Sequence, residues 1–225
     1  MAQVIVKPNR LKFNGKNYFR AGSEDVFVGS YGQKRTPLFG ANYLEVKDLV
    51  KPSKLEIEDV VVADIDFKQT RRGDLEEAIS GTLKGVDVSV SAGQAWEKFQ
   101  SGELKLVKLA VRNNDMEDAL NADADAIDDL RDYGARARVA HQTWVVMSAT
   151  LAETFGRAQG FEVSGGRGKI KVEVRGSTGQ AGSSTVTVSK GSTFAYLLAS
   201  LDWDARQKRK KKRVVDLDDD QWSVN

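Results

Sequence analysis

The chain has 225 residues, 40% hydrophobic and 29% charged, which is typical of a globular protein large enough for a core. Its 34 basic and 32 acidic side chains nearly cancel, so overall charge neither favours nor excludes an anionic partner. The lack of cysteine excludes disulfides, thiol catalysis and cysteine-ligated zinc. Because neither a signal-peptide pattern nor a run of about 20 apolar residues occurs, we expect a soluble cytoplasmic protein.

The first fifty residues predict short strands joined by tight turns. Asn14 and Gly15 separate two apolar stretches, and this dipeptide accepts the positive φ angles of a hairpin turn. A Gly-rich loop at 29–39 carries aromatic and basic side chains that we expect to be exposed. These are Tyr31, Lys34, Arg35 and Phe39. Composition alone also fits an ordinary surface loop.

Residues 55–112 alternate between apolar and polar side chains. Ile65 and Phe67, for example, share one face, while the residues on either side of Ile65 are acidic. The same alternation recurs at 86–91 and 104–112. A period of two predicts amphipathic antiparallel strands with one face in solvent.

Residues 114–133 predict the clearest helix. Asn114 is a good N-cap with Glu117 three residues later, and Gly134 suits the position after the C-terminus. One face is apolar and the other strongly acidic. The glycine and terminal glutamate of a calcium-binding EF-hand are absent, so we expect a solvated acidic face, or one that meets a basic neighbouring subunit.

Strand patterns continue from residue 144 to 204. Residues 144–151 and 169–174 predict two strands around a Gly-rich turn at 164–168. Further strand patterns occupy 185–189 and 194–199.

The last twenty residues are segregated in charge. A basic block at 206–213 precedes an acidic run at 216–220. Such a block can bind nucleic acid, act as a nuclear address, sit on anionic lipid or be cut by a trypsin-like protease. A solvated disordered tail, or pairing between the two runs, is equally compatible with the pattern.

Recognisable catalytic patterns are missing. His141 is the only histidine, and no nucleophile elbow, phosphate-binding loop or dinucleotide fingerprint is present. We therefore expect no enzyme activity, no cofactor and no metal.

Several stretches resemble gasdermin pore-forming domains. Residues 144–151 (WVVMSATL) resemble the strand after the family's long helix, and 106–111 (LVKLAV) the strand before it. Residues 185–196 (TVTVSKGSTFAY) are similar to a later strand that leads into a Lys-Gly-Ser segment. The early stretches 39–43 (FGANY) and 48–52 (DLVKP) are similar as well, so the order matches over 39–204.

The resemblance implies an α+β fold. We expect a twisted, mostly antiparallel β-sheet with extended amphipathic hairpins, one clear acidic amphipathic helix at about 114–133, and shorter helices. Residues 1–204 would form a single pore-forming domain, and 205–225 a basic then acidic C-terminal tail. Without a large inhibitory domain, this arrangement is similar to bacterial or fungal gasdermin-like proteins.

The resemblance also implies pore formation. Subunits would oligomerise on anionic phospholipids and insert β-hairpins from about 58–110 and 144–190 into a large β-barrel, leading to cell lysis or death. Barrel strands need about 9–11 alternating residues, and six segments fit: 60–68, 83–90, 104–112, 144–153, 168–175 and 184–190. The protein would move from the cytoplasm to the inner face of the cell membrane after activation, with a protease cutting at 206–213 as one route.

The candidate lipid-binding residues come from two basic loops, neighbouring aromatics and the tail. They are Tyr31, Lys34, Arg35, Phe39, Arg71, Arg72, Lys208, Arg209, Lys210, Lys211, Lys212 and Arg213.

Two rival interpretations remain. A self-assembling structural protein, such as a virion or tail component, would use the same strands and form rings or tubes without lipid. A nucleic-acid-binding module would act through 206–213, but no aromatic platform or recognition helix adjoins that block, so no nucleic-acid partner is expected.

Overall fold

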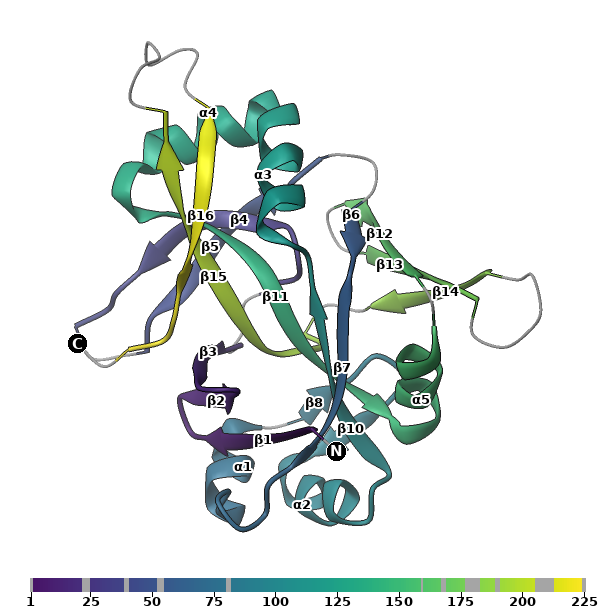
Figure 1. Cartoon of the computed structure of the whole chain (residues 1–225). Helices are drawn as coiled ribbons and strands as arrows, with labels where there is room; N and C mark the ends of the chain where they lie inside the picture. Colours follow the sequence, from purple (N-terminus) through teal and green to yellow (C-terminus); the bar gives the residue numbers. More distant parts are fainter. Residues whose placement is uncertain are drawn as a thin grey trace.

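The computed structural model describes residues 2–21, 25–38, 41–51, 55–79, 82–158, 160–166, 169–176, 183–188, 191–204 and 213–223. These residues form a mixed α+β fold around one long twisted sheet (Figure 1). Helices α3 and α4 lie at one end of the sheet, α1 and α2 at the other, and α5 beside a smaller sheet. The predicted fold class is confirmed.

The large sheet has the strand order β16-β15-β3-β2-β1-β7-β10-β11-β4-β5. Because β15 also pairs with β11, seven of these strands close into a ring. The described pairs are antiparallel except for β1 with β7. The strands are β1 (Ala2–Lys7), β2 (Arg10–Phe13), β3 (Lys16–Arg20), β4 (Ser30–Arg35), β5 (Tyr43–Leu49), β7 (Asp59–Ile65), β10 (Leu104–Ala110), β11 (Ala137–Ser148), β15 (Thr193–Trp203) and β16 (Val214–Asp220).

Two smaller sheets complete the strand structure. One has the order β14-β13-β12-β6, with β6 (Leu55–Ile57), β12 (Gly160–Gly166), β13 (Lys169–Arg175) and β14 (Ser183–Val188). The other is the hairpin of β8 (Thr82–Lys84) and β9 (Ser89–Ser91). The turn predicted between β2 and β3 is present: Asn14 has φ 47° and Gly15 φ 78°.

The predicted helix at 114–133 is two helices. They are α3 (Asn113–Ala122) and α4 (Ala124–Tyr133), separated by Asp123 in an extended conformation. The Asp123 carboxylate accepts hydrogen bonds from the backbone N–H of Ala126 (3.1 Å) and of Lys51 (2.6 Å). It therefore ends one helix and caps the next, which a continuous helix could not allow.

The remaining helices are short. They are α1 (Arg72–Ala78), α2 (Ala92–Gln100), the 3-10 turn η1 (Gly134–Arg136) and α5 (Ala149–Arg157). The core has two main parts. One lies under α3, α4, α5 and the smaller sheet, and the other joins α1 and α2 to β1, β2 and β10. Trp144 is fully buried in the second part, with its ring 5.0 Å from that of Phe13.

Candidate membrane-inserting segments and lipid-contact residues

The first candidate membrane-inserting segment, at about 58–110, begins with β7 and ends with β10, and these two strands pair with each other. β7 and β10 are antiparallel neighbours, with Ala63 opposite Leu106 and Val60 opposite Leu109. An ion pair between Lys105 Nζ and Asp64 Oδ1 (2.5 Å) links their polar faces. The strand patterns predicted at 60–68 and 104–112 are thus largely strand, and the two are already in hairpin register.

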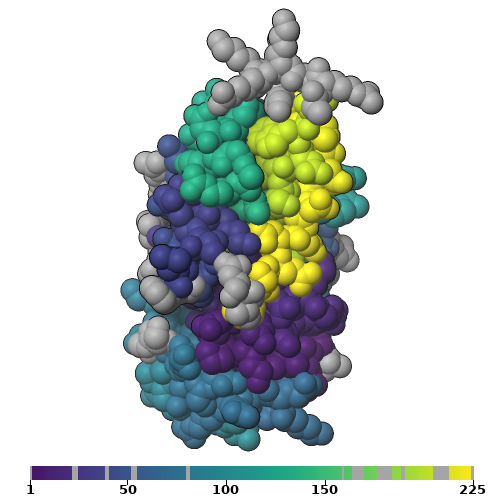
Figure 2. Space-filling view, turned by 90° about the vertical axis from the view of Figure 1, so that its left-hand side faces the viewer, coloured from purple at the N-terminus to yellow at the C-terminus, as the bar shows by residue number. Residues whose placement is uncertain are grey.

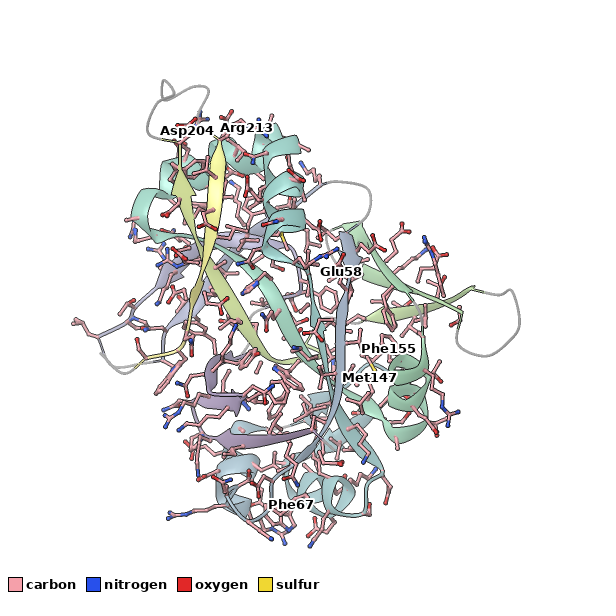
Figure 3. The ribbon with its side chains drawn as sticks, viewed as in Figure 1. Glu58, Phe67, Met147, Phe155, Asp204 and Arg213 are labelled. Atoms are coloured by element: carbon pink, nitrogen blue, oxygen red, sulfur yellow. The ribbon has the colours of Figure 1, made fainter. Side chains whose placement is uncertain are left out.

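The chain between β7 and β10 is folded into α1, the β8–β9 hairpin and α2. In this fold residues 83–90 are not one strand, because a turn at 85–88 separates β8 from β9; the barrel strand predicted there stays a prediction. Phe67 and Trp96 meet edge to face at 4.8 Å between ring centroids, which fastens α2 to the end of β7 (Figure 3 labels Phe67).

The period-two pattern nevertheless runs through this folded insert. Apolar side chains recur at odd positions from 63 to 83 and at even positions from 86 to 106. They are Ala63, Ile65, Phe67, Leu75, Ile79, Leu83, Val86, Val88, Val90, Ala92, Trp96, Leu104 and Leu106. Carrying the β7–β10 register forward places these two sets opposite each other on one face, with the turn at residues 84–85.

The second candidate segment runs from β11 to β14. The strand predicted at 144–151 ends at Ser148, whose Oγ accepts a hydrogen bond from Leu151 N–H (3.3 Å) and caps α5. The chain therefore continues as a helix because a serine cap precedes a run with apolar Ala152 and Phe155 on one side. Figure 3 shows Met147 and Phe155 at the junction of β11, α5 and the smaller sheet.

The strands after α5 fit the prediction better. β12 and β13 pair antiparallel, with Val163 opposite Val172, and β13 pairs with β14. Phe155 stacks on Phe161 at 5.3 Å, so α5 covers the apolar face of this sheet. The second segment, like the first, consists of amphipathic strands with helical structure between them.

Among the residues that the structure describes, the predicted lipid-binding side chains do not lie together. Tyr31 is buried (1% exposed), and its hydroxyl donates to Asp129 Oδ2 at 3.2 Å. Burial and the nearby Asp129 carboxylate raise the pKa of Tyr31 well above its usual range. The expectation of an exposed Tyr31 is therefore wrong, because β4 turns its side chain into the core under α4.

The predicted basic residues that the structure describes are mostly engaged in ion pairs. Lys34 Nζ contacts Asp220 (2.8 Å), and Arg35 contacts Glu45 (2.7 Å). At the distant α1 end, Arg71 is exposed and Arg72 contacts both Glu76 and Glu97 at 2.8 Å.

The other predicted lipid-binding residues belong to the tail and to the loop before β5. Arg213 is exposed and directly precedes β16. Six lie outside the described residues: Phe39, Lys208, Arg209, Lys210, Lys211 and Lys212.

The element that sequence reasoning missed is β16. Residues 214–220 pair antiparallel with β15, with Leu217 opposite Leu201, and so belong to the large sheet. The interpretation of this part of the tail as solvated chain is wrong. Figure 3 shows Asp204 and Arg213 side by side, where Asp204 N–H donates to Arg213 O at 2.9 Å and closes the ends of 205–212. The available signal was the apolar trio of Val214, Val215 and Leu217 between two charged runs.

The fold and these segments define an α+β protein whose distinctive feature is pairs of amphipathic strands separated by helical inserts. In the described part of the chain, no helix is both long enough and apolar enough to cross a membrane. Residues 40–210 match the family model of the gasdermin pore-forming domain, which is more than half of the chain. The protein therefore belongs to the gasdermin family, and membrane pore formation is the function that this match indicates. Searches of curated proteins and of solved structures found no match.

Proposed function

We propose that the protein oligomerises on membranes containing anionic phospholipid and permeabilises them by inserting β-hairpins into a large β-barrel. Residues 1–204 form the pore-forming domain, and 205–225 are a tail whose removal permits assembly. The protein acts from the cytoplasm on the inner face of the cell membrane, without enzymatic chemistry, and the outcome is cell lysis or death.

The observation that carries this proposal is the agreement between register and pattern in the first segment. In lipid, every backbone polar group must be bonded, so strands can cross only as part of a closed sheet. Extending β7 and β10 in their existing register gives a hairpin whose apolar residues coincide on one face. The opposite face carries mostly charged, serine and threonine side chains, as an aqueous lumen requires. On the apolar face the charged exceptions are Arg71, Glu77 and Lys98, and Arg71 falls opposite Lys98.

The second segment supports the same conversion. Apolar residues at odd positions from 145 to 163 include Val145, Met147, Leu151 and Phe155. The even positions from 148 to 164 are small or polar throughout. The β12–β13 register pairs Phe161 with Val174, so most apolar residues of both arms fall on one face. The exceptions in the first arm are Trp144 and Val146 on the other face, and the charged Glu153 and Arg157 on this face.

A cross-linking experiment can decide whether the folded insert between β7 and β10 must extend into a hairpin before the membrane is permeabilised. Cysteines replacing Phe67 and Trp96 can be bridged by a short bis-maleimide, because these side chains are in contact in the folded form. In the extended register the two positions are six residues apart along the hairpin, which is roughly 20 Å. The bridge should therefore abolish dye release from phosphatidylserine-containing liposomes, and arcs and rings on the bilayer should be lost with it.

The matched control bridges cysteines that replace Val62 and Val107. These residues are opposite each other in the β7–β10 ladder and remain so in the hairpin, so this bridge should leave release unchanged. Release that survives the Phe67–Trp96 bridge would contradict hairpin extension through this insert. No release from any form, together with rings or tubes in lipid-free buffer, would instead favour a self-assembling structural protein.

A further inference from the structure

The turn at 85–88, which belongs to the first candidate segment, lies against the end of β11. Val86 N–H donates a hydrogen bond to Val146 O at 2.9 Å. The Asp87 carboxylate accepts one from Ser148 N–H at 2.9 Å and another from the Ser148 hydroxyl. These contacts connect the first segment to the strand from which the second segment, at about 144–190, begins.

A glycine permits this close approach. Gly85 is buried, and a Cβ at its position would lie 2.7 Å from Val146 O and 2.4 Å from Val88 Cγ2. Any larger residue would therefore push the turn away from β11.

The turn covers a stretch of β11 edge that no neighbouring strand of the large sheet reaches. On one edge, β10 pairs with β11 as far as Ser148, and Ala149 N–H donates to Glu103 O at 2.8 Å. Backbone groups alternate between the two edges of a strand, so those of residues 146 and 148 point to the other edge. There β15 pairs with β11 only as far as Val145, which lies opposite Thr193. The 85–88 turn thus supplies the hydrogen-bond partners that β15 does not.

The second hairpin needs the same stretch of edge. Carrying the β12–β13 register back toward β11 places Thr187 opposite Ser148. Carrying the β15–β11 register forward from Val145 places the residues just before Thr193 along this edge as well. In the folded form, β14 pairs with β13 in the smaller sheet instead. The turn and the returning arm of the second hairpin therefore compete for one position.

We propose that the 85–88 turn locks the second hairpin: the edge of β11 at 146–148 stays closed to β14 until the first segment has unfolded. Asp87 and Gly85 are the positioning residues of this lock. In the extended β7–β10 hairpin, Asp87 lies 17 residues before Leu104, which is roughly 55 Å from the strand position opposite Ser148. Extending the first segment therefore removes the lock, and the two segments convert in a fixed order. This order in pore assembly rests on the proposed function, whereas the occupied edge does not.

The lock is separate from the contacts of the C-terminal strand. In Figure 2 the yellow C-terminal segment borders β4–β5 and the N-terminal strands. β16 pairs with β15 at 198–203, where β15 lies beside Arg138 near the start of β11. The 85–88 turn contacts the other end of β11, so withdrawing β16 leaves its hydrogen bonds in place.

Disulfide trapping measures how often the edge is free. The chain has no native cysteine, so T150C/T185C introduces a single pair. In the second hairpin these positions lie opposite each other, because they continue the β12–β13 register. In the folded form both threonines are exposed, one in α5 and the other in β14, on the sheet face opposite the one that α5 covers.

The full-length T150C/T185C protein is oxidised mildly in buffer, and the rate of disulfide formation is compared between variants. G85A forces the turn off the edge without touching Ser148, and D87A removes both hydrogen bonds to Ser148. Each should speed trapping about tenfold. The controls are G93A, where a Cβ meets nothing within 4 Å, and E77A, which removes an exposed charge from the same segment; neither should change the rate.

Equal rates in G85A, D87A and the two controls would overturn the lock. If trapping is too slow to detect in buffer, the same comparison is made on vesicles of phosphatidylserine in phosphatidylcholine. No trapping under either condition would overturn the register assigned to the second hairpin, and the lock with it.

Dye release from phosphatidylserine-containing liposomes, measured with the same substitutions in the cysteine-free chain, separates the lock from pore formation. G85A and D87A should shorten the lag before release several-fold, and G93A should not. Faster trapping in G85A and D87A without release from any variant contradicts pore formation and leaves the lock standing. Release with the same lag and the same trapping rate in all variants contradicts the lock and leaves pore formation standing.

Discussion

Replacing Asn121 by alanine should loosen β16 without loosening the rest of the sheet. The Asn121 side chain accepts a hydrogen bond from Val214 N–H (3.0 Å) and donates one to Val214 O (2.9 Å). Val214 is 1% exposed, so both backbone groups would lose their partner away from water. Each such orphaned group costs about 1–3 kcal/mol, so the loss should be at least about 2 kcal/mol.

Hydrogen exchange of the backbone amides in residues 213–223 measures this loss directly. A cost of about 2 kcal/mol corresponds to roughly 30-fold faster exchange if the strand opens locally. Asn114→Ala is the matched control, because Asn114 is exposed on the same helix and should change nothing in β16. A change in β16 below about threefold, or an equal change in β7 and β10, would refute local retention by Asn121.

Three further results are expected. Contact with His141 and Lys16 lowers the pKa of Asp219 to about 2. The stability that this carboxylate adds to the docking of β16 should therefore be complete above about pH 4 and lost as the pH falls to about 2. Hydrogen exchange of the β16 amides should become faster over this pH range, and the D219N variant should show no such change. Gly32→Ala should destabilise the fold by about 1–3 kcal/mol in urea unfolding, because a Cβ there would lie 2.0 Å from the carbonyl oxygen of Glu45; an unchanged midpoint would contradict that close approach. Ser148→Ala should cost about 1 kcal/mol and lower the melting temperature by roughly 2–4 °C, because α5 loses its cap and the Asp87 carboxylate loses the Ser148 hydroxyl; Ser148→Thr keeps a hydroxyl and should restore most of the stability.

Several strands were predictable because polar and apolar side chains alternate along them. β7, β13 and β14 show a two-residue period, whereas β10 is buried at every residue except Lys105. The Asn14–Gly15 turn fixes the β2–β3 hairpin. The gasdermin family was predictable from the order of these strands and is confirmed by the match over residues 40–210.

The wrong secondary-structure predictions occurred where a single capping residue ends or begins a helix. Ser148 begins a helix inside an apparent strand, and Asp123 divides an apparent helix, since both side chains cap backbone N–H groups. Tyr31 looked exposed beside Lys34 because sequence cannot show that α4 covers this part of β4.

The ion pairs of Asp220 could not be predicted from the sequence. Lys34 and Arg138 meet this carboxylate only because β4 pairs with β11 and β16 returns to the sheet. The acidic run at the C-terminus gave no period-two signal, because the strand is buried only at Val214 and Leu217.

The hydrogen bond between Asp204 and Arg213 has a kinetic consequence for a cut within 205–212. While the chain is intact, β16 rebinds as part of the same molecule, at a high effective concentration set by the short connection. After a cut, the same contacts remain, but the released segment becomes a separate ligand whose rebinding follows mass action. Dilution then favours departure, so the time between cutting and activation should be set by the dissociation rate of β16.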